Sequence, residues 1–150
     1  MTRKLNDYLL IRHTPNGRTF PYLDCWGLIV DVYREQLGIQ LNEYTDLDSK
    51  TMSRGFMWER QDGHFVEVEE PQNYDVVAFF FSGRLYHVGV WINGKVLHTS
   101  EKKNCRYEKL NNVSLSQRRF YRYAKDRSCQ SCGLEQNPRE EVRQESCLNT

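Results

Sequence analysis

The chain has 150 residues, of which 39% are apolar and 27% are charged. These values are typical of a globular protein with a single core. The formal net charge is +1, so no overall electrostatic field would attract nucleic acid or an anionic membrane surface. The apolar stretches are also too often interrupted by charge to span a bilayer. We therefore expect neither a nucleic acid partner nor membrane insertion.

The first segment with a regular pattern is Leu5 to Ile11, which predicts a short helix ended by the turn residues 14–17. Basic residues precede it, but the segment contains polar side chains and is too short for the apolar core of a signal peptide. We therefore expect synthesis in the cytoplasm without export by the usual route. The stretch from Arg18 to Leu23 is expected to be irregular.

The clearest helical pattern in the chain begins at Cys25. Apolar residues recur at helical spacing and predict one buried face, formed by Trp26, Ile29, Val30, Tyr33 and Leu37. Asp24 is placed to cap the N-terminus of this helix, and Gly38 is placed to end it. The pattern predicts a central buried helix with a cysteine in its first turn.

The second half of the chain has the pattern of strands. After a polar stretch at 42–62, with a short helix expected around 50–59, apolar or alternating runs predict strands at 64–68, 76–81, 86–92, 95–99 and 118–123. Asn93-Gly94 lies between two of these runs and predicts a tight hairpin. Helices followed by antiparallel strands indicate an α+β fold, in which a sheet is packed on one side by the central helix.

The C-terminal end differs in composition from the rest of the chain. The apolar content falls from about residue 124, and residues 136–145 are charged and polar. We expect one domain at 1–123 and a flexible or partner-ordered tail at 124–150. Three of the five cysteines, Cys129, Cys132 and Cys147, lie in this tail. They lack the complete four-ligand set of a structural zinc site, so we expect no metal there.

The position of Cys25 has a chemical consequence. Unpaired N–H groups and the positive end of the helix dipole lower the pKa of a thiol at a helix N-terminus, which favours the nucleophilic thiolate. In the predicted hairpin, pairing of 92 with 95 makes His87 and His98 diagonal neighbours within reach of a hydrogen bond. The three residues suit a nucleophile, a base and a group that orients the base. The alternative is a small core cysteine with structural histidines, and spacing alone does not decide between the two.

Three segments resemble motifs of the NlpC/P60 cysteine peptidases. Asp24-Cys25-Trp26-Gly27-Leu28 is similar to the nucleophile motif, and its tryptophan resembles the version in tailed-phage proteins. His87-Val88-Gly89-Val90-Trp91-Ile92 is similar to the base motif, and Val96-Leu97-His98 to the third catalytic position. The resemblance extends over about residues 5–123. Trp26, in place of the serine of the cell-wall enzymes, and Tyr74, in place of a common glycine, depart from the usual pattern.

The resemblance implies a papain-like α+β fold with Cys25 as nucleophile, His87 as general base and His98 as the orienting residue. It implies that no metal or cofactor is required. Residues that would contact a substrate, on the same resemblance, are Tyr22, Asp24 and Trp26.

The function implied by the resemblance is hydrolysis of an amide bond in a peptidoglycan stem peptide through a thioacyl intermediate. The phage-type motif implies a component of a virion tail, with tail proteins as partners, that acts in the periplasm or cell wall. Two alternatives keep the fold: a tail assembly or tail-tip protein with little or no activity, and an acyltransferase or maturation peptidase. Cys105, His13 and His64 are assigned to packing or to the surface.

Overall fold

The computed structural model describes residues 3–44, 54–113 and 117–124. The chain divides into two compact units, of which the first comprises 1–59 and 67–122 and the second 60–66 and 123–150. Apart from residue 124, the expected C-terminal tail with its three cysteines lies outside the described residues. No helix in the described ranges is both long enough and apolar enough to cross a membrane.

The N-terminal part of the first unit is more regular than the sequence indicates. A 3-10 helix, η1 (Leu5–Leu10), confirms the short helix expected there. It is followed by β1 (Arg12–His13), β2 (Arg18–Thr19) and β3 (Tyr22–Leu23), which form a small sheet in the order β1-β3-β2. The expectation of an irregular stretch at 18–23 was therefore wrong. The turn before β2 comes so close to β3 that a Cβ on Gly17 would lie 2.2 Å from the carbonyl oxygen of Tyr22.

The central helix begins where the sequence predicts. α1 (Cys25–Val32) is continued by a π-helical segment, η2 (Tyr33–Leu37), which ends at Gly38 with a φ of 70°. Every residue of α1 is buried, so this helix is enclosed on all sides and does not present a single buried face. Leu37, the last residue of the predicted buried face, is 38% exposed, so the prediction was wrong for this residue. It lies at the end of the π-helical segment, whose turn is wider than that of α1.

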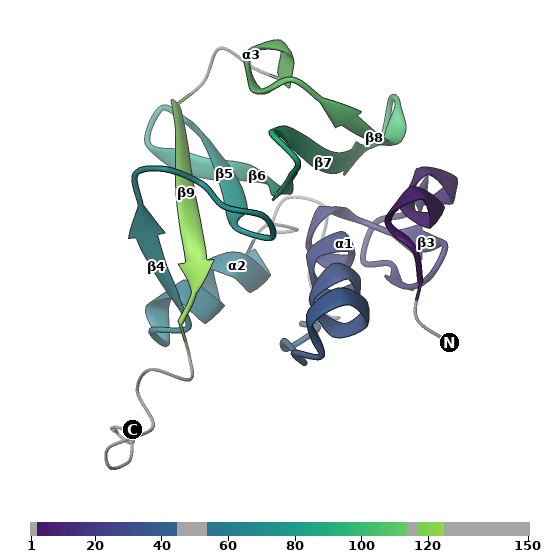
Figure 1. Ribbon diagram of the computed structural model, residues 1–150, viewed down its shortest axis with the longest axis horizontal. Helices are drawn as coiled ribbons and strands as arrows, with labels where there is room; N and C mark the ends of the chain where they lie inside the picture. The colour runs from purple at the N-terminus through teal and green to yellow at the C-terminus, as the bar shows by residue number, and fades with distance from the viewer. Residues whose placement is uncertain (1–2, 45–53, 114–116, 125–150) are drawn as a thin grey trace. The chain divides into compact units, whose positions relative to one another are not determined.

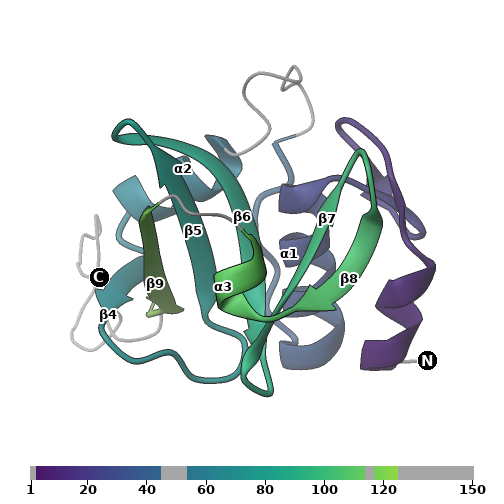
Figure 2. The same ribbon diagram turned by 90° about the horizontal axis from the view of Figure 1, so that it is seen from above.

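The remainder of the first unit is built on an antiparallel sheet (Figures 1 and 2). Its strands are β5 (Val76–Phe81), β6 (Arg84–Ile92), β7 (Lys95–Ser100), β8 (Asn104–Glu108) and β9 (Gln117–Tyr123). They lie in the order β9-β5-β6-β7-β8. The strands β5, β6, β7 and β9 confirm the sequence prediction, and so does the α+β class. The strand β8 and the short helix α3 (Leu110–Val113) were not expected.

The sheet is packed on both sides within the first unit. The central helix α1 contacts β6 and β7, as the two ribbon views show. A separate apolar cluster is centred on the buried side chains of Val77, Phe79 and Val96. Leu110 and Val113, which α3 supplies, pack against this cluster and cover it.

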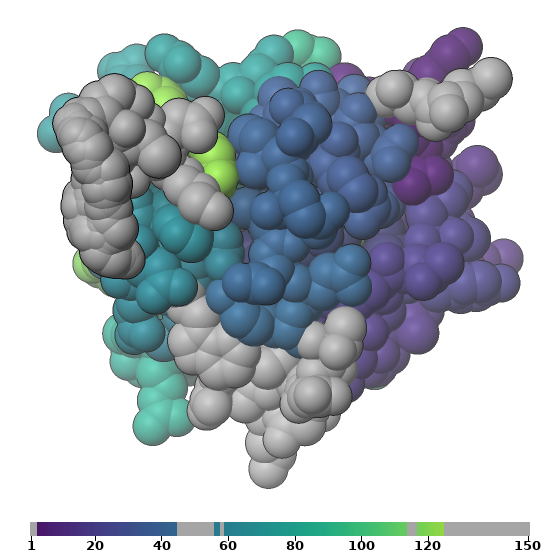
Figure 3. Space-filling model, turned by 90° about the horizontal axis from the view of Figure 1, so that it is seen from below, coloured from purple at the N-terminus to yellow at the C-terminus, as the bar shows by residue number. Residues whose placement is uncertain are grey.

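A buried carboxylate fastens the N-terminal segment to the central helix. Asp31 accepts hydrogen bonds from the guanidinium group of Arg3 at 2.9 Å, from Arg34 at 2.9 Å and from the hydroxyl of Tyr8 at 2.8 Å. The shared charge is thus compensated within the fold. In Figure 3 the N-terminal segment, in purple, lies beside the blue residues that follow α1.

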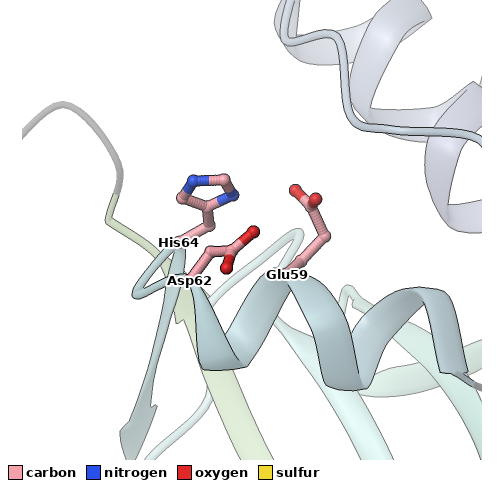
Figure 4. Close-up of side chains that lie close together, drawn as sticks. All are labelled: Glu59, Asp62 and His64. Atoms are coloured by element: carbon pink, nitrogen blue, oxygen red, sulfur yellow. The ribbon is translucent and has the colours of Figure 1, made fainter. Parts of the chain in front are cut away.

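The described part of the second unit is a turn and two strand ends. The helix α2 (Arg54–Gln61) ends here, and β4 (Phe65–Val68) begins here. The ring of Phe65 contacts that of Tyr123, with centroids 5.5 Å apart, and the N–H of Ala124 donates to the carbonyl of His64 at 2.8 Å. Figure 4 shows the side chains of Asp62 and His64 at this turn.

Candidate active site

Cys25 is the first residue of α1, and its side chain is 0% exposed. The helix begins there because the carboxylate of Asp24 accepts the backbone N–H of Gly27 at 2.8 Å, which confirms the expected cap. A glycine is required at position 27, because a Cβ there would lie 2.2 Å from the carbonyl oxygen of Gly17. The loop before β2 therefore packs directly on the first turn of the cysteine helix.

The carboxylate of Asp24 is fully engaged within the protein. Besides capping α1, it accepts a hydrogen bond from the backbone N–H of Asn16 at 2.9 Å and forms an ion pair with Arg18 at 2.7 Å. Both side chains of the ion pair are buried. Arg18 in turn donates to the carbonyl of Glu43 at 2.6 Å. Asp24 thus has its charge neutralised and its oxygen atoms occupied by the chain itself.

Of the three residues predicted to contact a substrate, Tyr22 alone presents surface. Its side chain, on β3, is 56% exposed. Trp26 is fully buried, and its indole N–H donates to the carbonyl of Asn42 at 2.9 Å. Asp24 and Trp26 therefore hold the start of α1 in place, and the structure gives neither of them a surface that a substrate could reach.

The two histidines of the β6–β7 hairpin are joined by a hydrogen bond. The observed ladder pairs Ile92 with Lys95, as the Asn-Gly turn predicts, and extends to Val90↔Leu97. Beyond this ladder, Nε2 of His87 lies 2.8 Å from Nδ1 of His98. The contact expected from the register is confirmed.

The surroundings of the histidine pair keep both rings neutral. Burial, together with smaller electrostatic contributions from His98, Arg106 and His13, lowers the pKa of His87 to about 3. The ring of Phe79 stacks on that of His87 with centroids 5.6 Å apart. Burial also lowers the pKa of His98, and this outweighs a hydrogen bond that raises it. Neutral imidazoles have the free lone pairs that proton acceptance requires.

Sequence reasoning missed the partner of the second histidine. Nε2 of His98 lies 2.7 Å from Oε1 of Glu108, which also accepts the Nε–H of Arg106 at 2.9 Å. Glu108 lies on β8, the strand that the sequence analysis did not predict. The signal was the alternation in residues 104–108 after the polar turn 101–103, which is typical of a short strand returning along β7.

His13 and Cys105 are the other reactive groups in this part of the first unit. The ring of His13 lies 3.2 Å, Nδ1 to Oγ1, from Thr99 on β7, and burial lowers its pKa although Asp24 and Glu101 raise it. Burial raises the pKa of the Cys105 thiol to about 12, so this buried cysteine stays protonated at neutral pH.

A cysteine that opens a buried helix, beside an antiparallel sheet with a hydrogen-bonded histidine pair, defines the papain-like class of α+β domain. The helix α1 contacts both strands that supply the histidines. Residues 13–124, which are more than half of the chain, match the model of the NlpC/P60 family. The chain therefore belongs to the NlpC/P60 family.

Two solved structures have a similar fold. One is the NlpC/p60 domain of peptidoglycan hydrolase SagA, with a TM-score of 0.52 and 15% identity over 76% of this chain and 91% of that chain. The other is NlpC1 from Trichomonas vaginalis, with a TM-score of 0.52 and 18% identity over 79% of this chain and 41% of that chain. The comparison with curated proteins found no match. At these identities the likeness is one of fold.

Proposed function

We propose that the chain is a cysteine peptidase that hydrolyses an amide bond in a peptidoglycan stem peptide. The observation that supports the reaction best is the hydrogen bond between His87 and His98, in a member of the NlpC/P60 family whose Cys25 opens a buried helix. The substrate class is supported by the fold shared with a domain of a peptidoglycan hydrolase. No step of the proposed reaction needs a metal or cofactor.

In the proposed reaction Cys25 is the nucleophile and His87 the base. His87 accepts the thiol proton while the sulfur forms a bond with the carbonyl carbon, and the carbonyl oxygen becomes an oxyanion near the N–H groups of the first helical turn. When the C–N bond breaks, the amine leaves with the proton held by His87. A water molecule then gives a proton to His87 and attacks the thioester, and the C–S bond breaks as the thiol recovers its proton.

The proposed substrate contact is Tyr22. Its exposed ring lies on β3, the strand immediately before the cap of the cysteine helix, so it is the predicted contact residue that a peptide could reach. Asp24 and Trp26 act in this proposal by fixing the position of the nucleophile.

Digestion of purified peptidoglycan tests the proposal. The wild-type protein should release peptide fragments that mass spectrometry identifies, whereas Cys25→Ala and His87→Gln should release none. Cys105→Ala is the matched control, because it removes another buried cysteine of the same unit that has no part in the reaction. Release that persists in Cys25→Ala, or none from the folded wild-type protein, would contradict the proposal.

A finer proposal concerns the biological setting. We propose that the domain at 1–123 acts on the cell wall or in the periplasm as part of a virion tail, to which residues 124–150 dock it. The support is the tryptophan after Cys25, which resembles the phage version of the motif. Antibodies against the chain should then label tails of the particles, and deletion of 124–150 should reduce incorporation. Unchanged incorporation would refute the docking role.

The complete burial of Cys25 favours a second candidate from a different class, a tail assembly protein with little or no activity. This candidate predicts that particles with Cys25→Ala assemble and infect normally, while loss of the whole chain blocks tail formation.

The remaining alternative is an acyltransferase or a maturation peptidase on the same fold. The first would transfer an acyl group to another acceptor and the second would cleave another protein, and both would leave peptidoglycan intact.

A further inference from the structure

Three polar side chains cross three neighbouring strands in a continuous chain of hydrogen bonds. His87 on β6 is bonded to His98 on β7, and His98 is bonded to Glu108 on β8. The register explains the second step, since His98 is paired with Arg106 and Glu108 lies two residues further along on the same face of β8. This series of hydrogen bonds therefore ends at the carboxylate of Glu108, whose side chain is 19% exposed.

The acceptor at the end of this chain determines where the protons lie. An ionised carboxylate only accepts hydrogen bonds, so Nε2 of His98 must be the protonated nitrogen of its ring. In the neutral ring, Nδ1 of His98 is then an acceptor, and the bond at 2.8 Å requires that Nε2 of His87 donates. Nδ1 of His87 is consequently the nitrogen that holds a free lone pair.

We propose that Glu108 is a positioning residue that fixes the tautomers of both histidines and so makes Nδ1 of His87 the proton-accepting atom. This inference rests on the proposed function of Cys25 and His87. Without an acceptor at Nε2 of His98, both tautomers of the His98 ring are available. In one of them Nδ1 of His98 is protonated and donates to His87, so that Nε2 of His87 becomes the acceptor. Nδ1 of His87 is then the protonated nitrogen and cannot act as the base.

The negative charge of Glu108 also favours the transfer of a proton to His87. When His87 accepts a proton, a positive charge forms two hydrogen bonds away from Glu108. Burial opposes ionisation of Glu108, but the bonds from His98 and Arg106 hold its pKa below the ordinary value. The carboxylate is therefore negative at neutral pH and stabilises the imidazolium through His98.

Arg106 keeps the carboxylate in place. Its Nε donates to Oε1 of Glu108 at 2.9 Å, while its Nη1 donates to the carbonyl of Asn104 at 2.8 Å and lies 3.1 Å from Oγ of Ser100. The guanidinium group is thus held on β8 and at the end of β7 by groups other than the carboxylate. Glu108 has a fixed orientation for the same reason, which a positioning role requires.

The test measures the tautomers directly, with the ring nitrogens of the full-length protein observed by ¹⁵N NMR. In the wild type, Nε2 should be the protonated nitrogen in both His87 and His98. In Glu108→Ala, the two nitrogen shifts of His98 should move toward each other as both tautomers become populated, and those of His87 should follow. Glu69→Ala, which removes an exposed carboxylate after β4, is the control and should change neither ring. Wild-type shifts in folded Glu108→Ala would overturn the proposal.

Activity on peptidoglycan adds a second readout. Glu108→Ala should lower kcat on the order of tenfold to a hundredfold with a smaller effect on KM. Glu108→Gln retains an acceptor oxygen and the side-chain volume, so it should recover part of the loss. If the glutamine variant were no better than alanine, the positioning role would be wrong.

The two proposals fail in distinguishable ways. A wild-type protein that shows the expected tautomers but leaves peptidoglycan intact would contradict the proposed function and support the role of Glu108.

If Glu108→Ala did not fold, the titration of His98 in Glu108→Gln would still test the proposal. Removing the negative charge beside His98 should lower the pH at which this ring titrates, because Glu108 raises its pKa against burial and the charges of Arg106 and Lys103. An unchanged titration would refute the proposal.

Discussion

Lowering the pH from 7 to 4 should destabilise the protein through His87. Burial and nearby positive charge lower the pKa of this ring in the folded state to about 3, against an ordinary value of 6.5. Below pH 6.5 the unfolded chain binds a proton that the folded chain does not, so the free energy of unfolding falls with falling pH. At about 1.4 kcal/mol for each pKa unit, the loss at pH 4 is roughly 3 kcal/mol. The stability is fully present above pH 6.5 and continues to fall until pH approaches 3.

Urea denaturation of the wild type and His87→Gln at both pH values isolates this contribution. Glutamine does not titrate, and its amide can still donate to Nδ1 of His98. Carboxylates and histidines away from the site titrate in both proteins, so they largely cancel when the two are subtracted. The wild type should lose roughly 3 kcal/mol more than the variant between pH 7 and pH 4. An equal loss in both would refute the claim that His87 is held neutral by burial.

Two other substitutions and one labelling experiment test packing and burial in the first unit. Gly89→Ala should lose activity and about 1 to 3 kcal/mol of stability, measured by denaturation, because its Cβ would lie 2.8 Å from Cγ1 of Val96 and 3.1 Å from Cβ of His98. Asp24→Ala should cost about 3 to 5 kcal/mol, since it leaves Arg18 buried without its partner, and a normal melting temperature would contradict this. Iodoacetamide at pH 8 should leave Cys105 unlabelled in the folded protein, as peptide mass spectrometry would show, because burial raises its pKa to about 12.

Elements with a strong local signal were predictable from the sequence. The start of α1 at Cys25 follows from a capping aspartate before an apolar run, and the structure shows that cap. The two-residue turn at Asn93-Gly94 set the pairing of Ile92 with Lys95, and with it the contact between the two histidines. These features depend on residues close together in the chain, where backbone geometry leaves few alternatives.

Features that depend on distant residues were not predictable. The short strands β2 and β3 have too few residues for a periodic pattern, and the loop at Gly17 that precedes β2 packs closely on both β3 and the cysteine helix. The ion pair of Asp24 with Arg18 is of the same kind, since nothing in a polar stretch shows that its arginine is buried. Glu108 was missed because its strand has only five residues, so the alternation in residues 104–108 is a weak signal, and the contact with His98 depends on the pairing of β8 with β7.

The nucleophile motif and the histidine chain are different kinds of evidence for catalysis. In the motif, Asp24 caps the helix, Trp26 anchors it to the loop at Asn42, and Gly27 permits the close approach of Gly17. These roles would be needed in an inactive protein of the same fold, so the motif alone does not distinguish an enzyme from a structural relative.

The hydrogen bonds from His87 through His98 to Glu108 are evidence of another kind. An apolar side chain in place of His87 would pack against Phe79 without the cost of removing a polar group from water. A buried hydrogen-bonded chain that ends on a carboxylate instead suits the movement of a proton. The tautomers of the two histidines show whether Nδ1 of His87 is prepared to accept a proton, and digestion of peptidoglycan then separates the catalytic from the structural candidate. Comparing the tautomers in the wild type and in Glu108→Ala tests the first point with no substrate in the sample.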